Sequence, residues 1–89
     1  MAAPIYATDP EESVSMVPLD GLTALFHAPS GITHILASPA PEILAALRQG
    51  PTEISGLVAR LRAAFELEGE EAVATRLDEL EDAGLVRRA

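Results

Sequence analysis

The sequence predicts a small α+β domain in which a three-stranded antiparallel sheet comes first and three helices follow. Two turn signals, Asp-Gly and Pro-Ser-Gly, separate three β-leaning segments, which are residues 14–19, 22–27 and 32–37. From Ser38 onwards the apolar residues recur at helical spacing instead. A chain of 89 residues suffices for one domain with a thin core. The expected element order is therefore β-β-β-α-α-α.

The segments 22–27 and 32–37 predict a β-hairpin in which His27 faces Ile32 and Leu25 faces His34. The preceding segment, residues 14–19, contains Pro18, which has no N–H group for a ladder and therefore suits an edge strand or the end of a strand. The hairpin register creates one face with Thr23, Leu25, His27, Ile32, His34 and Leu36. The other face carries Leu22, Ala24, Phe26, Thr33, Ile35 and Ala37. We expect this second face to turn towards the core. The first face is also rather apolar, and it would suit a protein partner or a homodimer.

The helices have their own start and stop signals. We expect Ser38 to be the N-cap of the first helix and Thr52 the N-cap of the second, with the third beginning near Gly69. Gly50 ends the first helix, and Gly84 follows the third. The apolar stripes are Ile43, Leu44 and Leu47, then Ile54, Leu57, Val58, Leu61 and Phe65, then Val73, Leu77 and Leu80. Leu85 and Val86 should pack back on the core.

The beginning of the chain differs in composition from the rest. Residues 1–13 are rich in Ala, Pro and acidic side chains, which predicts a mobile arm in front of a domain over residues 14–89. The segment lacks a basic start and a long apolar run, so it does not resemble a secretory signal. No apolar stretch approaches 18 residues. These features predict a soluble cytoplasmic protein.

The composition argues against several functions. The 14 acidic residues and 6 basic residues, all Arg, give a net charge of -8. This balance disfavours nucleic acid and anionic membrane surfaces as partners. Without Cys there is no disulfide, no thiolate nucleophile and no Cys-ligated metal. Without Lys there is no P-loop and no Schiff-base chemistry.

Two histidines and one serine are the chemically active side chains of the hairpin. His27 and His34 share a face, but zinc takes three or four protein ligands, so we interpret them as half-exposed strand residues without a metal. Ser30 could form a trio with a histidine and an acid, but it lacks the nucleophile-elbow motif. We therefore expect no catalysis, no metal and no cofactor.

The third helix predicts a different kind of site. On a helical wheel, Ala72, Arg76 and Ala83 form a shoulder beside the apolar stripe. Small side chains next to one Arg are compatible with a shallow groove. The alternative is that the shoulder is merely Ala-rich and that Arg76 pairs with nearby acids.

The arrangement of these segments resembles a known family. The hairpin, a helix ending in "LRQGP", a helix opening with "TEISGLVARL" and the segment "RLDELEDAGLV" are similar to the winged-helix-like PqqD family, also called the precursor-peptide recognition element. The resemblance covers roughly residues 17–86 and is most typical at Leu77, Leu80, Gly84, Leu85 and Val86. The run "PLDGLTALFHAPSGITHILASPAPEIL" looks most like the HPr-rel-A subgroup, which accompanies kinases related to the HPr kinase.

The resemblance implies a peptide chaperone without catalytic activity. Such a protein binds the leader of a ribosomally made precursor peptide as an added strand and presents it to a modifying enzyme. Carried over, the leader would lie along Thr33, His34, Ile35, Leu36 and Ala37, facing Ala72, Arg76, Leu80 and Ala83. Many members place an Asn and a small residue at the strand–helix junction, where this chain has "LASPAPE", so the ligand and the pathway stay open.

Two alternatives remain. One is a structural or regulatory subunit of a kinase-related enzyme complex, which the sequence does not separate from a peptide chaperone. The other is a winged-helix DNA regulator. It is less favoured because the exposed side of the third helix carries four acids against Arg76 alone, namely Glu71, Asp78, Glu79 and Asp82.

Overall fold

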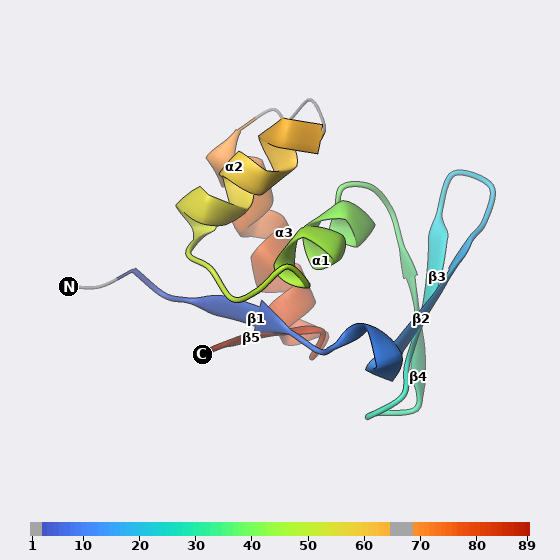
Figure 1. Ribbon diagram of the computed structural model, residues 1–89. Helices are drawn as coiled ribbons and strands as arrows, with labels where there is room; N and C mark the ends of the chain where they lie inside the picture. The colour runs from blue at the N-terminus through green and yellow to red at the C-terminus, as the bar shows by residue number, and fades with distance from the viewer. Residues whose placement is uncertain (1–2, 65–68) are drawn as a thin grey trace.

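The computed structural model describes residues 3–64 and 69–89 of the chain. It is an α+β fold in which a three-stranded antiparallel sheet is followed by three helices, as the sequence predicts (Figure 1). The sheet contains β2 (Val14–Pro18), β3 (Thr23–His27) and β4 (Ile32–Leu36). The helices are α1 (Ala40–Leu47), α2 (Ile54–Ala64) and α3 (Glu70–Asp82). Three short elements were not predicted: β1 (Tyr6–Thr8), the 3₁₀ helix η1 (Glu11–Ser13) and β5 (Val86–Arg88).

The register of the hairpin is the predicted one. His27 pairs with Ile32 and Leu25 with His34, and the strand order is β2-β3-β4. Gly21 and Gly31 adopt φ angles of 76° and 71° in the two turns, a backbone region that glycine enters without steric cost. The turn chemistry therefore determines the pairing of all three strands.

The prediction of the core-facing side of the hairpin is wrong. Leu25 is fully buried and His27 is only 6% exposed, whereas Phe26 and Ile35 are 44% and 58% exposed. The face that carries Leu25 and Leu36 turns towards the helices together with Val14 and Met16 of β2, which pack against the core. Both faces of the hairpin carry apolar side chains, and Val14 and Met16 of β2 add to the face of Leu25, which is therefore the one that the helices cover.

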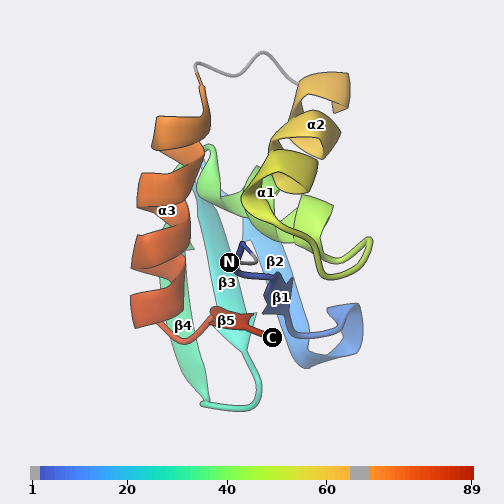
Figure 2. The same ribbon diagram turned by 90° about the vertical axis from the view of Figure 1, so that its left-hand side faces the viewer.

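The core lies between this inner face of the sheet and the three helices (Figures 1 and 2). The predicted helical stripes are buried: Ile43, Leu44 and Leu47 in α1, Leu57, Val58 and Leu61 in α2, and Val73, Leu77 and Leu80 in α3. Ile54 is partly buried against the same core. Phe65, also assigned to the second stripe, lies outside the described residues. Leu85 and Val86 pack back on the core as predicted.

The helix termini differ from the sequence prediction in two places. Pro39, and not Ser38, occupies the N-cap of α1, while the Ser38 hydroxyl donates to the Glu42 carboxylate. Thr52 precedes α2 by two residues and exchanges backbone hydrogen bonds with Tyr6 (2.9 and 3.1 Å). The third helix begins at Glu70, which confirms the predicted beginning near Gly69.

The segment expected to be an N-terminal arm contains a paired strand. Tyr6, Ala7 and Thr8 form β1, which pairs in antiparallel fashion with β5 near the other end of the chain. Tyr6 and Ala7 are buried, and the Thr8 hydroxyl donates to the Leu85 carbonyl (2.7 Å). A second, two-stranded sheet therefore holds the N-terminal segment against the helices (Figure 2).

The described helices are short, the longest being α3 with 13 residues. Within residues 3–64 and 69–89, none has both the length and the apolar character that crossing a bilayer requires.

Candidate functional site

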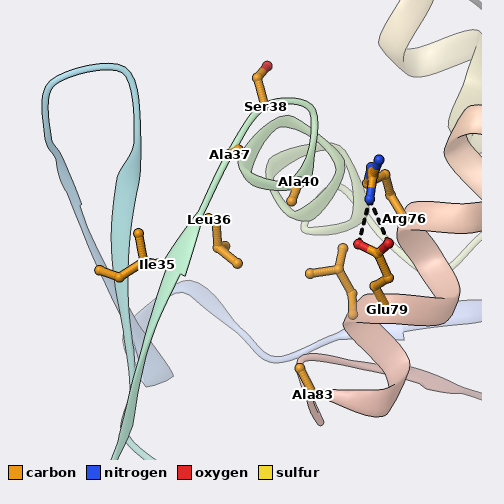
Figure 3. Close-up of a pocket in the computed structure, with 9 residues that line it drawn as sticks. Ile35, Leu36, Ala37, Ser38, Ala40, Arg76, Glu79 and Ala83 are labelled. Carbon is orange, nitrogen blue, oxygen red and sulfur yellow. Dashed lines mark hydrogen bonds and ion pairs between the residues drawn. The ribbon is translucent and has the colours of Figure 1, made fainter.

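A cleft of about 300 Å³ separates the end of β4 from α3 (Figure 3). One wall comes from the end of β4 and the turn after it, and the opposite wall from α3. The lining residues are Ile35, Leu36, Ala37 and Ser38 on the first wall, Ala40 at the start of α1, and Arg76, Glu79, Leu80 and Ala83 on α3. The fold therefore brings a strand and a helix side by side across an open groove.

The hydrogen bonds of the sheet determine which backbone groups face this groove. The Ala28 amide donates to the Ser13 carbonyl (2.9 Å), and Leu19 and Leu22 exchange both backbone bonds (2.7 and 3.3 Å). Along an antiparallel strand, consecutive residues direct their N–H and C=O groups to opposite sides. The even-numbered residues of β3 therefore direct their backbone groups to β2, and the odd-numbered residues direct theirs to β4.

The same alternation continues into β4. Leu25 pairs with His34, so the backbone groups of His34 point to β3. Thr33 and Ile35 then direct their N–H and C=O groups away from β3. Within the described part of the chain, β4 has no strand on that outer side. β4 is therefore an open edge that can pair with another extended segment.

The side chains of this edge alternate in the same way. Leu36 points towards α3, whereas Ile35 points to the other side of the sheet (Figure 3). Leu36 is partly buried against the core, and Leu80 of α3 is 3% exposed. The floor of the cleft is therefore apolar, and small alanines at positions 37, 40 and 83 leave space above it.

One ion pair lies on the helical wall of the cleft. Arg76 Nη1 donates to both Glu79 carboxylate oxygens at 2.6 Å. The side chains of Arg76 and Glu79 are 42% and 59% exposed, so this pair is an accessible polar feature beside the apolar floor. The pair also confirms that Arg76 finds an acid on its own helix. A groove and an Arg–acid pair are therefore both present at the third helix.

Six of the nine sequence-predicted site residues line the cleft: Ile35, Leu36, Ala37, Arg76, Leu80 and Ala83. The other three do not. Thr33 is exposed on the open edge itself, His34 is half-buried on the inner face, and Ala72 is half-buried in the first turn of α3. Ser38, Ala40 and Glu79 were missed. Glu79 could have been found, because it lies one helical turn from Arg76.

The hairpin turn holds a second polar cluster. The Nδ1 atom of His27 lies 2.7 Å from Ser30 Oγ, and its Nε2 atom lies 2.6 Å from Asp9 Oδ2. Arg87 contacts the other oxygen of Asp9 at 3.2 Å. His27 is thus buried with both ring nitrogens partnered, which corrects the expectation of a half-exposed side chain. None of these residues lines the cleft. We interpret the cluster as a structural link between β3, the N-terminal segment and β5.

The described residues contain no group of three or more His, Asp or Glu side chains placed to hold one metal ion. His34 is half-buried, as expected for a strand histidine, and its Nε2 atom is buried without a hydrogen-bond partner. The cleft itself has three features: the backbone edge of β4, an apolar floor and the Arg76–Glu79 pair.

Comparisons with protein families, curated proteins and solved structures find no match for this chain.

Proposed function

We propose that this protein is a non-catalytic module that binds an extended peptide segment by strand addition to β4. In this proposal the segment is the leader of a ribosomally made precursor peptide, and the protein presents it to a modifying enzyme in the cytoplasm. The observation that carries the proposal is the open edge of β4, with the backbone groups of Thr33 and Ile35 directed outwards beside the cleft.

The free energies show what such a ligand must contain. Thr33 and Ile35 offer up to two donors and two acceptors, and each backbone hydrogen bond contributes about 0.5–1.5 kcal/mol. Association costs at least about 4 kcal/mol. Backbone pairing alone therefore gives little or no binding. An apolar side chain that the cleft buries adds about 1.5–3 kcal/mol, so specific binding requires one or two such anchors.

The cleft suggests how the ligand is oriented. In an added strand, alternate side chains point towards α3 and the others point to the outer side of the sheet. The inward side chains would meet Leu36 and Leu80, and a Leu, Ile or Phe fits the small alanines around them. Arg76 and Glu79 stand on the helical wall, where each could exchange its ion pair for a polar or charged group of the ligand.

The same edge could receive a segment of a larger protein. The protein would then be a structural or regulatory subunit of an enzyme complex, for instance with a kinase related to the HPr kinase. DNA binding is less favoured, because Glu71, Asp78, Glu79 and Asp82 are exposed along α3.

Affinity capture of the tagged protein from its host, with mass spectrometry of the peptides and proteins retained, tests the proposal. We expect a short peptide, alone or with a modifying enzyme. Ile35→Pro removes an outward donor and should abolish the recovery of that peptide. Ile35→Ala keeps the N–H group and should retain it. Recovery of an enzyme without a peptide would favour the subunit function, and equal recovery by both variants would refute binding at this edge.

A further inference from the structure

The side of the three-stranded sheet that faces away from the helices is apolar and uncovered in the described part of the chain. Its side chains come from alternate positions of the three strands, and we call this set the outer face: Ser15, Val17, Ala24, Phe26, Thr33 and Ile35. Val17, Phe26 and Ile35 are between 44% and 58% exposed. An exposed apolar surface of this kind on a small protein marks a site of association.

The charge distribution indicates which partner the outer face suits. β2, β3 and β4 contain no Asp, Glu or Arg, although the whole chain has 14 acidic and 6 basic residues. The two histidines of these strands belong to the inner face. A charged partner would find nothing here with which to pair. A second copy would bring no like charges into direct contact, which matters for a chain of net charge -8.

The side chains of the outer face also alternate in size. Phe26 pairs with Ser15 on one side and Thr33 on the other, so its large ring stands between two small side chains. Ala24 pairs with Val17 and Ile35, so a small side chain lies between two larger, branched ones, and we call this position the Ala24 hollow. These two positions lie two residues apart on β3, a distance of about 7 Å. A two-fold axis between them would place each Phe26 ring over the Ala24 hollow of the other copy.

We propose that two copies of this protein associate through their outer faces, with Phe26 of each inserted beside Ala24 of the other. Such a contact is isologous, because the same surface serves both copies. Stacked sheets lie about 10 Å apart and pack through side chains, so the backbone edge of β4 stays open. The dimer and the addition of a strand to β4 therefore use different groups, and this inference does not depend on the proposed function.

Sedimentation equilibrium over a concentration series tests the proposal. The wild-type mass should rise from 9.3 kDa towards twice that value as the concentration increases. Phe26→Glu brings a charge into the contact, and Ala24→Leu fills the hollow without adding a charge. Each should raise the dimer dissociation constant at least about tenfold, which corresponds to 1.4 kcal/mol. Ile32→Glu is the matched control, because Ile32 is 53% exposed but belongs to the other face, and it should leave the constant unchanged.

Circular dichroism shows whether each variant is folded. If Phe26→Glu does not fold, Ala24→Leu decides, because its added atoms point to solvent in the monomer. A wild-type protein that stays at 9.3 kDa throughout the series would overturn the proposal. So would a dimer that both outer-face variants leave intact. A monomer that instead recruits a different protein through Phe26 would show that the outer face has another partner, and it would equally refute association between copies.

Discussion

Proline substitutions at two neighbouring positions of β4 test the orientation of its backbone. At Ile35, proline removes an N–H group that points to the open edge. At His34, proline removes an N–H group that points to Leu25 of β3. We therefore expect His34→Pro to lower the free energy of unfolding strongly and Ile35→Pro to change it little.

The orientation of the two N–H groups determines how much stability each proline costs. His34→Pro removes the donor of one ladder hydrogen bond and leaves the opposite carbonyl unsatisfied, which costs about 1–3 kcal/mol. This loss is a large part of the stability of a small domain. Ile35→Pro loses no ladder bond. It also restricts the unfolded chain, which stabilises by about 0.4–1 kcal/mol. Both residues follow extended strand residues, which is the conformation that a proline requires before it.

Urea denaturation followed by circular dichroism measures this difference. His34→Ala and Ile35→Ala are the references, so that the loss of each side chain cancels from the comparison. Relative to its alanine reference, Ile35→Pro should stay within about 1 kcal/mol of zero, whereas His34→Pro should lie well below its own. An equal loss at both positions would mean that the Ile35 N–H group belongs to the ladder, and the argument for an open edge beside the cleft would fail.

Three further substitutions have defined outcomes. Asp9→Ala leaves one buried ring nitrogen of His27 without a partner, so it should lower the free energy of unfolding by about 1–3 kcal/mol in urea denaturation. An unchanged midpoint would show that the link has no structural role. Arg60→Met removes two hydrogen bonds, to the carbonyl of Ala46 in α1 and to that of Gly50 in the following loop. It should lower the thermal midpoint by several degrees, with Arg62→Met, at an exposed position, as the control. Arg76→Glu breaks an exposed ion pair with Glu79, so it should lower the free energy of unfolding by no more than about 1 kcal/mol. The same variant should nevertheless reduce peptide recovery in affinity capture.

The pairing of the hairpin could be predicted because it depends on local chemistry. Asp-Gly and Pro-Ser-Gly specify turns, and a turn of known length fixes which residues are opposite. The buried side could not be read from the hairpin alone. Leu25, Phe26 and Ile35 are all apolar, and the choice depends on Val14 and Met16 in the neighbouring strand.

The polar partners of buried groups were also hidden from sequence reasoning. A histidine in a strand suggests an exposed position unless its partners are known. His27 is buried because Asp9, 18 residues away, and Ser30 satisfy its ring nitrogens. Likewise, β1 could not be predicted, because three residues have no periodicity to recognise and their partner strand lies at the opposite end of the sequence.

The cleft was predictable in its main parts and not in its extent. Helical spacing placed Arg76 and Ala83 beside the apolar stripe that contains Leu80. The family resemblance, and not the hairpin pattern, implied that Ile35 and Leu36 lie opposite them. The wheel also put Ala72 in the groove, although this residue lies a full turn beyond Arg76. A wheel shows direction around a helix but not how far along the helix the opposite wall extends.

The pairing of β1 with β5 has a consequence for the order of folding. The Thr8–Leu85 hydrogen bond joins residues 77 positions apart, and contacts of this separation require the closure of a very long loop. Because β5 follows the Ala83 end of α3 directly, closing this loop ties that end of the cleft wall to the N-terminal segment. We therefore expect the local sheet hairpins to form before β1 pairs with β5.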